Sequence, residues 1–234
     1  MGRHFEVRQA AMAATAKQKS AANMRASKEI YMAAKRGVPD PESNLALRSA
    51  IEKYRKVCPK DVIERAIKKA QGGDATNYIE GRYEAFGPGN SYLIIDTLTD
   101  NVNRALVNVR TAVTRKGGHL GSVIYNFEQR GLLVFDYKGT EEELEEALVF
   151  GDVDVKEVSL EEGKAEVVTE PSDFEKAKEI LKGLGITEFD VSEIRMLANE
   201  RITLEGEDLR KFKDLLDALD DCEDVQNVYH NVEL

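Results

Sequence analysis

The sequence contains few of the residues on which most enzymes and metal sites depend. It has two cysteines, three histidines and no tryptophan. Cys58 and Cys222 lie far apart and show no CxxC spacing, which excludes a disulfide framework and a zinc site and fits a reducing compartment. The chain also lacks the GxSxG, HExxH and GxxxxGK[ST] patterns of hydrolases, zinc proteases and phosphate-loop proteins. We therefore expect no enzyme activity, no metal and no cofactor.

Long apolar segments are also missing. No run approaches the roughly 20 residues that a membrane-spanning helix requires, and the N-terminal residues lack the apolar core of a secretory signal. Myristoylation at Gly2 is disfavoured because Glu6 stands where that motif has Ser or Thr. The expected location is the cytoplasm, without membrane attachment.

Charge is abundant and unevenly distributed. The formal net charge is −10. Residues 1–70 carry sixteen Lys and Arg against seven Asp and Glu, whereas residues 131–234 carry eleven against thirty. Such asymmetry indicates a segment that binds a polyanion, joined to an acidic segment that nucleic acid would repel.

The first third of the chain has a helical pattern. Good helix formers run from Phe5 to Arg36, and a Pro-containing turn follows. A second helix is expected from about Asn44 and a third after Pro59, the latter ending at a Gly-Gly pair suited to a helix cap. Residues 1–77 are therefore predicted to form a basic helical domain.

The rest of the chain alternates strands and helices. Residues 78–97 form a predicted hairpin, followed by a helix over 101–116 and a strand over 123–128. Residues 131–200 follow a βαββαβ order, which is the ferredoxin-like unit. One αβ pair remains at the C-terminus, too small to fold alone. We therefore predict an α+β protein with a helical bundle and two ferredoxin-like α/β lobes. The acidic lobe, residues 131–200, is inserted into the lobe formed by residues 78–130 plus 201–234.

The basic side chains of the first domain are the first candidates for a nucleic-acid site. On a continuous first helix Lys17, Lys28 and Lys35 fall within about 20° of one another. Phosphate binding requires clustered cations of this kind because each neutralised phosphate releases counterions. A merely solvated helix face is the alternative interpretation. The candidate residues in the helical domain are Lys17, Arg25, Lys28, Lys35, Lys60, Arg65, Lys68 and Lys69.

A second candidate group lies at the start of the helix over 101–116. Asn101 and Asn103 suit the capping position, and Arg104 can donate to a phosphate or to a nearby carboxylate. Capping is the simpler explanation for the asparagines. No helix-turn-helix, zinc finger or RNP-type aromatic motif is present, so sequence-specific base recognition is not supported.

Several separated blocks of the sequence, in the same order, resemble the YebC family. They are Pro39–Asn44, Leu47–Arg48, Pro59–Lys69, Tyr83–Gly89, Leu98–Arg104, Gly117–Val123 and Val228–Asn231. Two segments depart from the family pattern. Residues 2–8 replace the usual Gly-His-Ser-Lys-Trp type opening, and the loop Gly118–Ser122 is shorter by a couple of residues.

The resemblance implies a helical head followed by two α/β lobes, without enzyme activity. It further implies a role in gene expression, either as a transcriptional regulator or as a translational activator that associates with ribosomes. It places Lys60, Arg65, Lys68 and Lys69, with Asn101, Asn103 and Arg104, at positions that touch RNA or DNA. Three hypotheses follow: a translation-associated factor that binds ribosomal or messenger RNA, a DNA-binding transcriptional regulator, and a protein-interaction adaptor that uses the acidic lobe.

Overall fold

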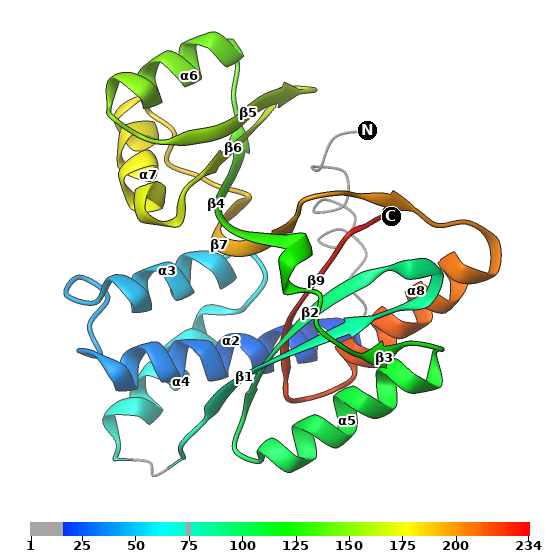
Figure 1. Ribbon diagram of the computed structural model, residues 1–234. Helices are drawn as coiled ribbons and strands as arrows, with labels where there is room; N and C mark the ends of the chain where they lie inside the picture. The colour runs from blue at the N-terminus through cyan, green and yellow to red at the C-terminus, as the bar shows by residue number, and fades with distance from the viewer. Residues whose placement is uncertain (1–15, 74–75) are drawn as a thin grey trace. The chain divides into compact units, whose positions relative to one another are not determined.

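A computed structural model describes residues 16–73 and 76–234, with side chains from Gln18 onward, and places them in two compact units (Figure 1). One unit is Gln129–Leu197. The other combines the described residues up to Glu128 with Ala198–Leu234. The predicted helix residues 5–15 and the side chain of Lys17 lie outside the described part.

Three helices form the head of the larger unit, and each begins or ends where its local sequence requires. They are α2 (Ala16–Arg36), α3 (Leu45–Tyr54) and α4 (Lys60–Gln71). Asn44 caps α3, since its side chain accepts a hydrogen bond from the backbone N–H of Leu47 at 3.0 Å. Ile30, Leu47 and Ile63, one from each helix, meet in a shared buried core.

A four-stranded sheet follows in the same unit. Its strands are β1 (Ile79–Phe86), β2 (Tyr92–Thr99), β3 (His119–Leu120) and β9 (Val225–His230), in the order β3-β1-β2-β9. Helices α5 (Val102–Arg115) and α8 (Gly206–Asp220) share one hydrophobic core with this sheet. Strand β9 pairs with β2. The strand order is that of a ferredoxin-like sheet in which β1 takes the place of the third strand.

Only the last two residues of the predicted strand over 123–128 are extended, and they begin the strand β4 (Phe127–Asp136). Residues Ile124–Asn126 form a 3₁₀ turn instead, and the short strand β3 lies just before it. The cause is Glu84, whose carboxylate accepts hydrogen bonds from the backbone N–H groups of Val123 and Ile124 at 2.7 and 2.8 Å. Those donors are therefore not available to a sheet ladder. Two short parallel strands that the pattern did not predict, β8 (Ile202–Thr203) and β10 (Val232–Glu233), pair near the C-terminus.

The second unit has the βαββαβ order without permutation. Its elements are β4 (Phe127–Asp136), α6 (Glu141–Phe150), β5 (Val155–Glu161), β6 (Lys164–Thr169), α7 (Phe174–Gly183) and β7 (Val191–Ala198). The strand order β5-β6-β4-β7 is the ferredoxin-like order. Both helices lie against the same face of the sheet (Figure 1), where Leu144 and Leu181 pack on Phe135.

The predicted fold class is confirmed: a helical bundle precedes two ferredoxin-like α/β lobes, and one lobe is inserted into the other. The finer division into domains at residues 77, 130 and 200 stays a prediction. No helix in the described part of the chain is long and apolar enough to cross a membrane.

Gly118 tests how tightly the glycine loop packs on the sheet. A Cβ atom there would overlap the carbonyl oxygen of Phe86 and lie 2.9 Å from a methyl carbon of Val113. We expect Gly118→Ala to lower the free energy of unfolding by about 1–3 kcal/mol in urea denaturation. Gly72→Ala is the control, because a Cβ at Gly72 meets only ordinary contacts at 3.6 Å. Equal stability of the two variants would contradict this packing.

Candidate nucleic-acid interface

Helix α4 presents cations on the face opposite its buried side. Ile63 and Ala66 are buried in the head core, whereas Lys60, Arg65, Lys68 and Lys69 are exposed. The side chains of Lys60 and Arg65 are 90% and 72% exposed. At 100° per residue, Arg65 and Lys68 point away from the buried side of α4, whereas Lys60 and Lys69 lie on its two flanks.

Acidic side chains on α4 partly balance these cations. Lys60 pairs with Glu64 at 3.4 Å and Arg65 with Asp61 at 2.7 Å, both with i,i+4 spacing. Exposed pairs of this kind contribute only about 0.2–1 kcal/mol, so a phosphate can replace the carboxylate partner. Lys69 also lies over the ring of Tyr31, 5.3 Å from its centroid.

The turn between α3 and α4 adds two cations that the sequence pattern did not single out. Arg55 and Lys56 follow directly after α3, and both are exposed. Because Arg55 and Lys56 are not on the same helix as Lys60, the helical periodicity of the sequence does not place them on one face with it. Only the short turn, which ends at Pro59, places them next to the first residue of α4. The candidate surface therefore consists of Arg55, Lys56, Lys60, Arg65, Lys68 and Lys69, and is called the α4 surface below.

The expected basic stripe on α2 is not an exposed surface. Lys28 is only 8% exposed, and its ammonium group donates to the carbonyl oxygens of Leu98 and Glu223, the latter at 2.7 Å. Lys35, although exposed, donates to the carbonyl of Thr76 at 2.6 Å and to the Tyr31 hydroxyl. The side chain of Lys17 lies outside the described residues.

Arg25 also faces the protein. Its guanidinium donates to the carbonyl oxygens of Val225 and Asp220, both at 3.1 Å, and pairs with the Asp220 carboxylate at 2.6 Å. Arg25 and Lys28 therefore fasten α2 to the C-terminal part of the α/β domain. Helical spacing alone could not reveal this, because the carbonyls that they bind come from residues about 70 to 200 positions further along the chain.

Asp224 is the centre of this junction. Its side chain is 1% exposed and accepts two hydrogen bonds from Arg104, at 2.9 and 2.6 Å, while the Lys28 ammonium lies 3.9 Å away. Burial alone would raise the pKa of Asp224, but hydrogen bonds from Arg104 and Thr99 and the nearby positive charges lower it overall. Burial in turn lowers the pKa of Lys28. The carboxylate therefore holds two cations from different parts of the chain.

The second candidate group begins α5. Asn101 caps the helix by accepting a hydrogen bond from the backbone N–H of Arg104 at 3.0 Å. Asn103 is exposed. Besides Asp224, Arg104 binds Asp100 at 2.8 Å, and these carboxylate hydrogen bonds raise its pKa above the usual range. Of the two alternatives considered for Arg104, the structure shows the carboxylate contact.

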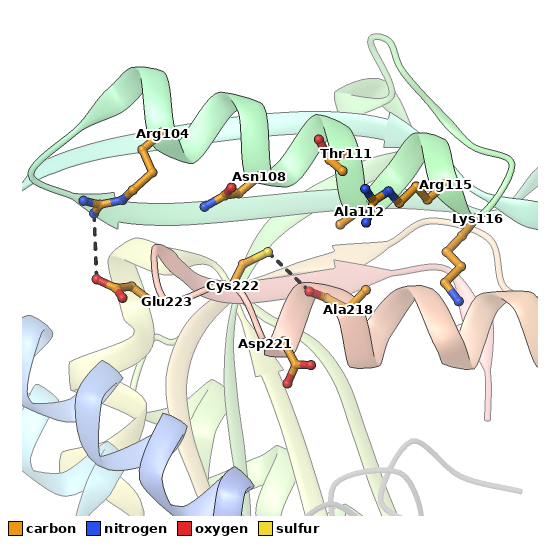
Figure 2. A pocket seen from close by; sticks show the side chains of 10 residues that line it. All are labelled: Arg104, Asn108, Thr111, Ala112, Arg115, Lys116, Ala218, Asp221, Cys222 and Glu223. Carbon is orange, nitrogen blue, oxygen red and sulfur yellow. Dashed lines mark hydrogen bonds and ion pairs between the residues drawn. The ribbon is translucent and has the colours of Figure 1, made fainter.

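A groove of about 790 Å³ lies between α5 and the end of α8 (Figure 2). One side is formed by Arg104, Asn108, Thr111 and Arg115, which follow one another along α5. Asp221 and Glu223 belong to the opposite side, together with Cys222. Burial raises the pKa of the Cys222 thiol, so it remains protonated at neutral pH. With charges of both signs, this groove is less suited to phosphate than the α4 surface is.

Within the ranges 16–73 and 76–234, no three His, Cys, Asp or Glu side chains are grouped as a metal-ion site would require. The structure has exposed cations on α4, and it has a buried lysine, Lys28, and a half-buried arginine, Arg25, that attach the head to the sheet. The fold and this charge distribution define an α+β protein with a cationic helical head and an acidic ferredoxin-like unit.

Comparisons with known proteins identify the family. Residues 3–73 match the TACO1/YebC protein N-terminal domain, and residues 78–232 match the TACO1/YebC second and third domain. The chain belongs to the TACO1/YebC family. The chain is 50% identical over 235 residues to the probable transcriptional regulatory protein Mfl546 of Mesoplasma florum, with 99% of each chain covered. It is 48% identical over 209 residues to the probable transcriptional regulatory protein YeeN of Escherichia coli, with 87% of each covered.

A solved structure shows the same architecture. The crystal structure of a conserved hypothetical protein, Aq1575 from Aquifex aeolicus, matches with a TM-score of 0.77 and 32% sequence identity. The match covers 92% of this chain and 90% of that one. The resemblance to the YebC family seen in the sequence is thereby confirmed, and the names of the relatives support a role in gene expression.

Asp224→Asn tests the junction between head and sheet. Removing the carboxylate leaves the buried Lys28 without its nearest negative charge, so we expect the free energy of unfolding to fall by about 3 kcal/mol at neutral pH. Asp100→Asn is the control. Its carboxylate also binds Arg104 but is 53% exposed, and we expect a loss below about 1 kcal/mol.

The same pair of variants predicts a pH dependence. Because the pKa of Asp224 is lowered in the folded protein, its contribution to stability is present above the ordinary aspartate pKa and is lost as the pH falls through the lowered value. The stability difference between the unsubstituted protein and Asp224→Asn should therefore be constant at neutral pH and shrink below about pH 4. A difference that persists unchanged in acid would contradict the assignment.

Proposed function

We propose that this protein is a non-enzymatic, cytoplasmic, nucleic-acid-binding factor in gene expression that contacts the phosphate backbone through the α4 surface. Its proposed target is ribosomal or messenger RNA in translation. The family resemblance supports the role in gene expression, and the translational activators that it implies are the reason for proposing RNA as the target. The exposure of the α4 cations supports the mode of contact, since the side chains of Lys60 and Arg65 are 90% and 72% exposed.

The shape of the α4 surface favours backbone contact over base recognition. A single short helix with cations on its outer face can follow phosphates, whereas base recognition requires side chains that enter a groove in a fixed register. Lys60 and Arg65 are held only by weak exposed pairs, so exchanging carboxylate for phosphate costs little. The binding expected from such a surface depends steeply on salt and little on sequence.

A DNA-binding transcriptional regulator is the second candidate function. It is favoured by the relatives Mfl546 and YeeN, both of which are named probable transcriptional regulatory proteins. Phosphates of DNA and RNA make the same demand on lysine and arginine, so the α4 surface serves both hypotheses. The distinction lies in the target that the protein finds in the cell.

Neutralising the α4 surface tests the mode of binding. We expect the combined variant Lys60→Gln, Arg65→Gln, Lys68→Gln to bind a ribosomal RNA fragment at least about tenfold more weakly at low salt. The slope of log affinity against log salt should fall by about 2–3, because each lost phosphate contact removes about 0.7–0.9. All three side chains are exposed, so folding should be unaffected.

The matched control removes the same charge from the acidic unit. Lys138, Lys176 and Lys182 are exposed there, and their replacement by glutamine should leave the affinity and the slope nearly unchanged. Equal loss in both triple variants would show a response to net charge rather than a site. No loss in the α4 variant would refute the proposal.

Co-sedimentation and footprinting separate the two targets. A translation factor should co-sediment with ribosomes at low salt, and the α4 variant should not. A transcriptional regulator should instead protect a defined promoter segment and leave ribosomes unbound. Promoter protection without ribosome association would replace the first hypothesis with the second.

A further inference from the structure

The outer face of α6 in the acidic unit carries an apolar pair that the fold does not use. Phe150 is 96% exposed and Val149 is 58% exposed, at the last two positions of the helix. On the inner face of the same helix Leu144 and Leu148 are fully buried. Isolated exposed apolar residues are ordinary, but Phe150 is almost fully hydrated beside a second apolar side chain.

Local structure holds Phe150 in this exposed position. Gly151 follows at the end of α6, and a Cβ atom there would collide with the side chain of Ile180 on α7. The start of α6 is fixed by a capping box between Thr140 and Glu143. The helix is thus secured at both ends. Because Phe150 is turned 200° from Leu148, it cannot reach the core without unwinding the last turn.

Carboxylates occupy the rest of the same face. Glu142, Glu145 and Glu146 precede Val149 and Phe150 with spacings of three and four residues, so all five lie on one side of α6. All three glutamates are exposed, and in the described part of the chain they have no cationic partner. By contrast, Glu141 and Glu143 hold backbone N–H groups of Leu160 and Thr140. The carboxylates that stabilise the fold around α6 are therefore Glu141 and Glu143, not the three glutamates of the outer face.

The occupant that fits this face is a cationic protein segment. Residues 129–197 carry eight Lys and Arg against nineteen Asp and Glu, a net charge of −11. Nucleic acid and anionic lipid are repelled by such a field, and a neutral apolar partner would leave the carboxylates unpaired. A segment rich in lysine and arginine satisfies the glutamates, and an aromatic or aliphatic side chain within it covers Phe150.

We infer that the outer face of α6 is a docking site for a Lys/Arg-rich protein segment that carries an apolar anchor residue, with Phe150 as its main contact. The site is separate from the α4 surface, so this chain has one surface for a polyanion and another for a polycation. The inference does not depend on whether the nucleic-acid target is RNA or DNA.

The test measures binding of the full chain to a fluorescent lysine-rich peptide with one central phenylalanine. The peptide should bind with an affinity that weakens as salt rises, and the same peptide with alanine in the centre should bind about tenfold more weakly. Phe150→Ser should reduce affinity for the first peptide by about tenfold and remove the preference between the two. Glu142→Gln, Glu145→Gln and Glu146→Gln together should weaken both peptides and flatten the salt dependence.

Tyr125→Ser is the matched control, since Tyr125 is 85% exposed and lies outside the acidic unit. It should bind both peptides as the unsubstituted protein does. Unchanged binding by Phe150→Ser, or equal loss in the control, would overturn the inference. So would concentration-dependent self-association that Phe150→Ser abolishes, because a second copy of the chain would then be the occupant. Binding of the RNA fragment should be the same in Phe150→Ser as in the unsubstituted protein, which separates this test from that of the α4 surface.

Discussion

The buried carboxylate of Asp224 decides how the positive charge of the head is used. It lies at the start of the last strand of the sheet, binds Arg104 and attracts Lys28 from α2. A buried carboxylate needs such partners, since an unpaired charge in that position would be costly. Arg25 binds the Asp220 carboxylate and the carbonyl of Val225. Together, Asp224 and Arg25 attach one side of the basic helix α2 to the sheet. The cations proposed to bind a ligand, which form the α4 surface, are exposed instead.

The net charge of the head is therefore a poor measure of its binding surface. Lys28 and Arg25 count toward the basic excess, yet both are directed into the protein. Lys60 and Arg65 face solvent from α4, where short-range partners from the same helix hold them only weakly. The smaller compact unit, residues 129–197, carries a net charge of −11 and exposes Phe150 among carboxylates. The uneven charge of the sequence thus reflects one structural junction and the two surfaces for which binding is proposed.

Local patterns predicted most of the fold because they depend on neighbours within a turn or two. The helices at 45–54, 60–71 and 141–150 lie where apolar spacing, caps and glycines indicate. The failures are contacts between distant residues. Part of the strand expected over 123–128 is a turn because Glu84 captures its N–H groups, and the α2 stripe is interrupted because Lys28 meets Leu98 and Glu223. Arg55 and Lys56 join the candidate site only through the turn that precedes α4, which no periodicity marks.

The division between inner and outer cations is tested most directly by the reactivity of individual lysines toward an amine-specific reagent, with and without saturating ribosomal RNA. We expect Lys60 and Lys68 to react readily in the free protein and to become protected in the complex. Lys28 should be unreactive in both states, and Lys138, Lys176 and Lys182 should be unchanged. A reactive Lys28 in the free protein, or unaltered modification of Lys60 and Lys68 at saturation, would contradict this division.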